Sequence, residues 1–112
     1  MKIKIQIIFS LLLVCTVTLH SQVITVAPAF PTSSDGVVVT FNADQGNKGL
    51  MDYTGEVYAH TGVITDKSTS DSNWKYVIAA WEVNNPKVLM TRVSANVYTL
   101  TISPSIREFY GV

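Results

Sequence analysis

The chain has 112 residues with eight basic and eight acidic side chains, so its formal net charge is zero. Neither nucleic acid nor an anionic membrane surface is predicted as a partner, because both require clustered basic residues and the charges here are scattered. Apart from a targeting segment at the start, the length fits one small domain.

Residues 1–21 have the pattern of a secretory signal peptide. A short basic start precedes an apolar run from Ile5 to Val17, which is shorter than the roughly 20 apolar residues of a membrane span. Cleavage is predicted between Ser21 and Gln22, so the mature chain is expected at the cell surface, in the periplasm or outside the cell. No stable membrane span is expected after cleavage.

The one cysteine of the chain, Cys15, lies inside this apolar run. The preceding residues, Leu12 to Val14, lack the small side chain that precedes the lipid-modified cysteine of a lipoprotein. We therefore interpret Cys15 as one more apolar residue of the signal peptide. Residues 22–112 contain no cysteine, so packing must stabilise them without a disulfide.

From Gln22 onwards, short segments alternate between apolar and polar residues and are separated by clusters of Gly, Pro, Asn, Asp and Ser. This period of two predicts β-strands. The predicted strands are Val23–Val26, Val37–Asn42, Glu56–Thr61 with a continuation to Thr65, Trp74–Trp81, Val88–Val93 and Val97–Ile102. The last two are expected to form a hairpin across residues 94–96.

A short helix is predicted near the end of the chain. Ser103 is a favourable N-cap, Pro104 suits the first helical position, and Gly111 suits the position just past a helix end. Residues 105–110 are therefore predicted to form one or two helical turns.

The predicted fold class is all-β, an immunoglobulin-like β-sandwich formed by residues 22–112. Strands at intervals of about ten residues with turn signals between them are typical of this architecture. Such a sandwich has seven strands and only six are predicted, so the last strand is expected to lie in sequence beyond Val112. The domain is thus expected to be incomplete at its C-terminus and to carry an open strand edge.

Five segments are distinctive as a set: Ala27–Pro31, Val39–Ala43, Tyr53–Thr65, Trp74–Val77 and Leu100–Val112. Together they resemble the N-terminal immunoglobulin-like module of secreted Bacteroidetes alpha-amylase family glycoside hydrolases. The resemblance extends over essentially all of residues 22–112 and is most specific between Val57 and Thr65. It implies a starch-like glucan as partner and a parent protein in which a further strand and a catalytic domain follow. It transfers no catalytic residue.

Catalytic and metal chemistry are not favoured by the motifs. His60 is the only histidine of residues 22–112 and no nucleophile elbow or zinc-binding histidine pair accompanies it, so a structural role is preferred over a general base. Asp52 and Glu56 are close in sequence, and two carboxylates at a suitable distance can hydrolyse a glycosidic bond. Acids scattered over loops always supply such pairs, so solvated loop acids are the preferred interpretation. The oxygen-rich segment 66–71 lacks the glycine and the closing glutamate of a calcium loop. No cofactor and no metal are expected.

Aromatic side chains give the better hypothesis, because flat rings can stack on the apolar faces of sugars. Trp74 and Tyr76 are predicted on one face of their strand and Trp81 on the other. Trp74 is expected to pack in the core and Trp81 to lie at the periphery. The candidate ligand-binding residues are Trp74, Tyr76, Trp81, Tyr58 and His60.

The predicted function is that of a non-catalytic accessory module, either carbohydrate-binding or a spacer, in an exported alpha-amylase-like polysaccharide-degrading protein. The alternative is an extracellular adhesion or protein-interaction domain that accepts a strand at its open edge.

Overall fold

The computed structural model describes residues 22–112, and the predicted signal peptide with its cleavage after Ser21 lies outside this range. The strands are β2 (Ile24–Ala27), β3 (Val37–Asn42), β4 (Thr91–Ser94) and β5 (Val97–Ile102). The helices are the short 3₁₀-helix η2 (Pro86–Val88) and the α-helix α1 (Ile106–Tyr110). The described part of the chain is therefore all-β, as predicted, with very little helix.

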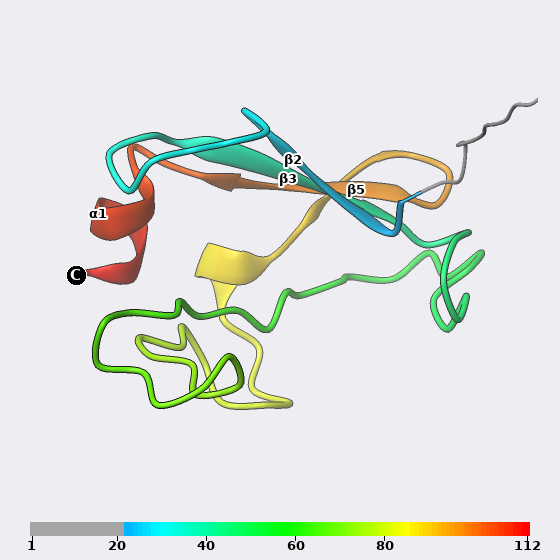
Figure 1. The fold of residues 1–112 in the computed structure, drawn as a ribbon. Coiled ribbons are helices and arrows are strands. Elements are labelled where there is room, and N and C mark those ends of the chain that lie inside the picture. Colours follow the sequence, from blue (N-terminus) through cyan, green and yellow to red (C-terminus); the bar gives the residue numbers. More distant parts are fainter. Residues whose placement is uncertain (1–21) are drawn as a thin grey trace, which may run out of the picture.

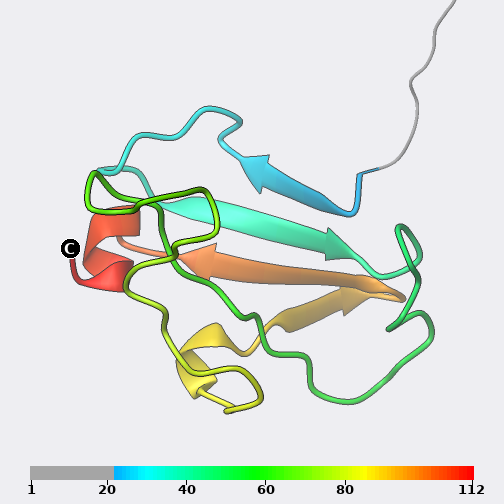
Figure 2. The ribbon, with the colours of Figure 1, turned by 60° about the horizontal axis from the view of Figure 1, so that its bottom comes forward.

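The four strands form one antiparallel sheet in the order β2-β3-β5-β4 (Figures 1 and 2). The pairing of β3 with β5 places apolar residues directly opposite one another: Val37 opposite Ile102, Val39 opposite Leu100 and Phe41 opposite Tyr98. Because side chains alternate along a strand, these pairs lie on one face of the sheet, where they form most of the core.

A row of threonines crosses the opposite face of the sheet. Thr25 pairs with Thr40, Thr40 pairs with Thr99, and Thr99 pairs with Thr91, so each of the four strands contributes one residue. Threonine favours extended backbone and carries a hydroxyl that water can solvate. This face is therefore the solvent face of the sheet. The alternation of apolar and polar residues in the sequence assigns these threonines to it.

Residues 53–85 form an irregular layer against the apolar face of the sheet (Figures 1 and 2). The predicted strands Glu56–Thr61 and Trp74–Trp81 are wrong, since this layer contains only two isolated bridges, Tyr58 with Leu89 and Val63 with Lys75. Tyr76 adopts a φ of 53°, which interrupts any extended chain through the second segment.

The predicted strand Val88–Val93 also differs from the structure. Its first part belongs to η2, which Asn85 caps by accepting a hydrogen bond from the Lys87 amide at 2.9 Å. The Val88 carbonyl and the Met90 amide then bond to the irregular layer, whereas the following residues of β4 pair with β5. This stretch of chain therefore connects the two layers.

The core consists of two adjoining clusters of buried side chains. Its buried residues are Val37, Val88, Leu100, Ile102, Phe109 and Tyr110 in one cluster and Ala43, Val57 and Tyr98 in the other. Tyr98 is only 1% exposed, and its hydroxyl donates a hydrogen bond of 3.0 Å to the Tyr53 carbonyl. A buried tyrosine needs such a partner, because an unpaired hydroxyl would make burial costly.

Helix α1 closes one end of the core. Ser105, not the predicted Ser103, is the N-cap: its hydroxyl accepts from the Glu108 amide at 3.1 Å and lies 3.1 Å from the Glu108 carboxylate. The first contact satisfies an N–H group that the first helical turn leaves free, and in the second the Ser105 hydroxyl donates to the carboxylate. Gly111 ends the helix at a φ of 77°, as predicted from the sequence.

Lys87 supports the other end of the helix. Its ammonium group donates a hydrogen bond to the Phe109 carbonyl and lies 4.5 Å from the centroid of the Phe109 ring. A cation at this position satisfies a carbonyl that the last helical turn leaves free and complements the helix dipole. Within residues 22–112, no helix has the length and apolar character needed to cross a bilayer.

Candidate functional site

The most distinctive surface feature is a cluster of three rings formed by His60, Trp74 and Trp81, which we call the aromatic cluster. The His60 ring lies 5.6 Å from the Trp74 ring at an interplanar angle of 34°, and 5.3 Å from the Trp81 ring at 78°. All three residues come from the irregular layer and all three are exposed. The structure thus brings together three of the five predicted ligand-binding residues.

Backbone contacts place Trp74 beside His60. Val63 and Lys75 exchange two hydrogen bonds of 2.9 and 2.7 Å, which align the chain around Trp74 with the chain after His60. Gly62 makes this approach possible, because a Cβ atom there would lie 2.9 Å from the Lys75 carbonyl oxygen. The small residue is therefore required for the two segments to meet.

A tight turn presents Trp81 to solvent. The Val83 amide bonds to the Ala80 carbonyl at 3.0 Å, and Glu82 adopts a φ of 69° in the left-handed region. A non-glycine residue in this region is uncommon and is held there by its surroundings. The turn leaves Trp81 71% exposed, at its outer corner.

The expectation that Trp74 packs in the core is wrong, since its side chain is 45% exposed. The peripheral position predicted for Trp81 is confirmed. Because residues 74–81 do not form a strand, their side chains do not alternate between two faces. Tyr98, Phe109 and Tyr110 fill the core in place of a tryptophan.

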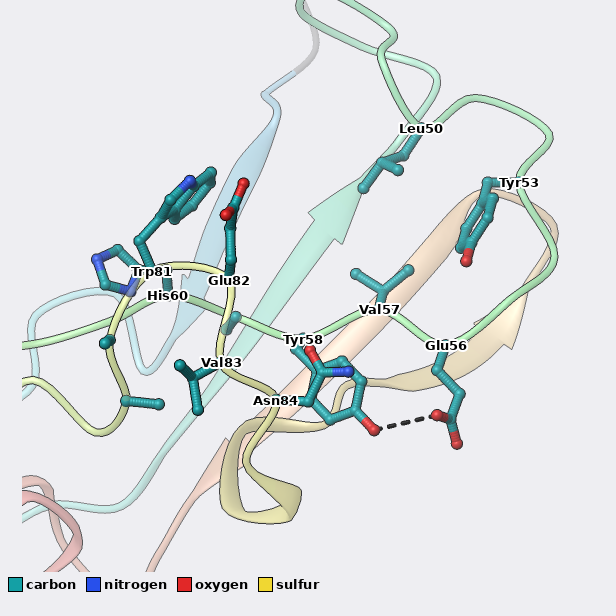
Figure 3. Close-up of a pocket in the computed structure, with 13 residues that line it drawn as sticks. Leu50, Tyr53, Glu56, Val57, Tyr58, His60, Trp81, Glu82, Val83 and Asn84 are labelled. Atoms are coloured by element: carbon teal, nitrogen blue, oxygen red, sulfur yellow. Dashed lines mark hydrogen bonds between the residues drawn. The ribbon is translucent and has the colours of Figure 1, made fainter.

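Tyr58 and Trp81 line the same recess, which has a volume of about 290 Å³ (Figure 3). His60 and Trp81 form one end of it in Figure 3, and Tyr58 and Glu56 lie towards the other. The Tyr58 hydroxyl donates a hydrogen bond of 3.0 Å to Glu56, and this bond is the main reason why the pKa of Tyr58 is raised; burial and the charge of Glu56 add to it.

The recess combines apolar and polar surface. Leu50, Val57 and Val83 supply aliphatic surface, while Asn84 and Glu82 add an amide and a carboxylate. None of the residues that line it, all within the described range, is Lys or Arg. A site with two acids and neither Lys nor Arg favours an uncharged ligand over an anionic one.

Tyr76, the fifth predicted ligand-binding residue, lies elsewhere. It is 53% exposed and lines a separate depression together with Lys87 and Tyr110. Sequence reasoning in turn missed Glu82 and Asn84 as parts of the recess. Their only signal was their position between Trp81 and Pro86, in a stretch that separates two predicted strands.

Several oxygen-bearing side chains of the loop at 65–73 are engaged in local turns. The hydroxyls of Ser68 and Ser70 accept from the amides of Thr65 and Ser72, at 3.0 and 3.3 Å. Asn73 accepts from the Thr69 amide at 3.0 Å. Among residues 22–112 no three His, Cys, Asp or Glu side chains gather to form a metal site.

Asp52 and Glu56, which are close in sequence, have separate hydrogen-bonding partners in the structure. The Asp52 carboxylate accepts a hydrogen bond of 3.2 Å from the Asn96 amide group, at the tip of the β4–β5 hairpin, whereas Glu56 accepts from the Tyr58 hydroxyl.

A scan against protein-family models and a search of curated proteins find no match for this chain. Its function therefore has to be argued from the site itself.

Proposed function

We propose that residues 22–112 are a non-catalytic accessory module that binds a neutral glycan at the aromatic cluster, within an exported alpha-amylase-like polysaccharide-degrading protein. The observation that carries the proposal is the contact of His60 with two tryptophans that are both exposed. Contiguous exposed rings are typical of an interaction surface, and sugars offer apolar C–H faces of matching size.

The recess beside the cluster supports the same proposal. A sugar stacked on Trp81 carries hydroxyl groups at its edge, and the recess offers Asn84, Glu82 and the Tyr58–Glu56 pair as hydrogen-bonding partners. A few polar groups beside apolar surface are the usual composition of a small-ligand site. The acids disfavour uronic or sulfated sugars, which would place like charges together.

The export context and the complete fold belong to the same proposal. The segment before Gln22 is proposed to direct secretion to the periplasm, the cell surface or the medium. The module is proposed to be an immunoglobulin-like sandwich that a further strand completes and a catalytic domain follows. The support for these points is the basic-then-apolar start, the sheet with its second irregular layer, and the family resemblance.

Pull-down on insoluble starch and affinity electrophoresis through soluble glucans test the binding role. The wild type should be retained, and Trp81→Ala should weaken binding about tenfold or more, the loss expected for a ring that stacks on the ligand. Tyr76→Ala is the control, because it removes an exposed ring outside the cluster, 53% exposed against 71% for Trp81. Retention no greater than that of an unrelated β-domain would leave only a spacer role.

The edge of the sheet at β2 supports a second candidate, a protein-interaction domain. Ile24 and Val26 point to the same face as the core, yet they are 51% and 39% exposed. An extended segment of a partner could add to this edge and cover them. Val26→Lys should abolish such binding and leave glycan binding intact; a partner bound equally by both forms would exclude this edge.

A further inference from the structure

We infer that the aromatic cluster takes a single hydrated glycan chain and does not take the flat face of a crystalline polysaccharide. This inference rests on the proposed function and adds the physical form of the ligand. It follows from how the two tryptophan rings are inclined to each other, and from the recess next to them.

The two tryptophans do not share a plane. The Trp74 ring is inclined by 34° to His60 and the Trp81 ring by 78° to the same imidazole. The planes of Trp74 and Trp81 must therefore differ by at least 44°, the difference between these two angles. Because His60 contacts both rings, the three rings form a folded surface and not a flat platform.

The face of a crystalline polysaccharide exposes sugar rings that all lie in one plane. Stacking requires the two partners to present their faces to each other, so a second aromatic ring contributes only when it is coplanar with the first. On such a surface Trp74 or Trp81 can lie flat, but the other ring is tilted away. Against a flat ligand, the folded arrangement therefore loses the stacking contact of one of its two tryptophans.

A free chain does not have this difficulty. Rotation about its glycosidic bonds lets successive sugars turn their faces by different amounts, so one sugar can stack on Trp81 and a later one on Trp74. A single chain can also enter the recess of about 290 Å³, where Glu82 and Asn84 meet its hydroxyl groups (Figure 3). The edge of a crystal is too broad to reach them.

The backbone fixes where the two tryptophans start, and His60 orients their rings. The paired hydrogen bonds between Val63 and Lys75 hold the segment that carries Trp74, and the turn closed by Val83 and Ala80 holds the segment that carries Trp81. Each indole then packs against the imidazole of His60, which lies between them. Turning the tryptophans into one plane would change at least one of these two ring contacts.

The test compares the same sugar in two physical forms, using the full chain. Cello-, chito- and malto-oligosaccharides in solution are titrated and followed by tryptophan fluorescence, and crystalline cellulose, crystalline chitin and crystalline amylose are used in pull-down. We expect at least one soluble series to bind saturably, with affinity reduced about tenfold or more in Trp81→Ala. Retention on the crystalline form of the same sugar should not exceed that of Trp81→Ala.

The outcomes separate this inference from the function on which it rests. Retention on a crystalline form that matches or exceeds the binding of its soluble form, and that Trp81→Ala abolishes, would overturn the inference and leave glycan binding standing. Absence of binding to every form would overturn both. Binding of soluble chains that Tyr76→Ala weakens as much as Trp81→Ala would also overturn the inference, because the folded cluster would then not be the site.

Discussion

The hydroxyl oxygens of Tyr110 and Thr61 lie 2.6 Å apart, although 49 positions separate the two residues in the sequence. Tyr110 belongs to α1 and is buried in the core, whereas Thr61 directly follows His60 in the irregular layer. This hydrogen bond therefore connects the helix that closes the core to the segment that carries the aromatic cluster. Stability of the core and geometry of the site are linked at this point.

Replacing Tyr110 with phenylalanine should cost about 1 kcal/mol of unfolding free energy, because the Thr61 hydroxyl loses its partner while the ring remains packed. Urea unfolding monitored by circular dichroism measures this loss. Tyr76→Phe is the control, since that side chain is 53% exposed, and it should change stability by less than about 0.5 kcal/mol. Equal effects of the two substitutions would contradict the assigned bond.

Alkaline pH should destabilise the protein through its tyrosines. Burial raises the pKa of Tyr110 above its ordinary value of 10.0, and the bond with Thr61 offsets this only in part; the bond to Glu56 raises the pKa of Tyr58. A group whose pKa is raised by folding stabilises the protein fully below its unfolded pKa. That stabilisation is lost as the pH rises through the folded pKa.

Unfolding free energies measured from pH 8 to above pH 10 test this expectation. The wild type should lose stability at the alkaline end, and Tyr110→Phe should lose less, because one of the titrating groups is gone. Identical slopes for the wild type and for Tyr110→Phe would show that Tyr110 ionises as freely in the folded protein as in the unfolded chain.

The N-cap of α1 offers a direct comparison between two serines. Ser105→Ala removes the hydroxyl that accepts from the Glu108 amide, and should cost about 1 kcal/mol. Ser103→Ala alters the serine that the sequence alone favoured, and should change stability by less than about 0.5 kcal/mol. Thermal unfolding of both variants decides which serine is the N-cap. A larger loss of stability for Ser103→Ala than for Ser105→Ala would place the helix start two residues earlier.

Tyr98 tests the centre of the core. Tyr98→Phe should cost about 1 kcal/mol, because the Tyr53 carbonyl loses a hydrogen bond of 3.0 Å. Tyr98→Ala should cost about 3–5 kcal/mol, the range for removing a buried aromatic ring. Urea midpoints provide the measurement, and a loss in Tyr98→Ala no larger than in Tyr98→Phe would mean that this ring is not a core residue.

The sequence predicted some elements to the residue and others not at all. Val37–Asn42 and Val97–Ile102 are strands with the predicted ends, because both alternate over most of their length and pair along their full length in the centre of the sheet. Trp74–Trp81 contains a continuous apolar run without alternation, so its composition does not distinguish a strand from irregular packed chain. The left-handed backbone at Tyr76 then excludes the strand.

At helix α1 the sequence offered two possible N-cap residues. Ser103 and Ser105 are both acceptable N-caps, and only Ser105 is followed three residues later by a glutamate, the sequence spacing typical of a helix start. The candidate site was predictable as a set of residue types, since exposed aromatic residues are the usual means of binding sugars. Its geometry was not, because no periodic pattern relates His60 to Trp74 and Trp81.

Both tryptophans of the chain lie against His60, so all tryptophan fluorescence originates in the aromatic cluster. A titration of the protein with soluble neutral glucans, followed by this emission, is therefore the most direct test of glycan binding. The account predicts a saturable change in emission that His60→Ala and Trp81→Ala diminish and that Tyr76→Ala leaves unchanged. Emission that stays constant across neutral glycans of every class would contradict it.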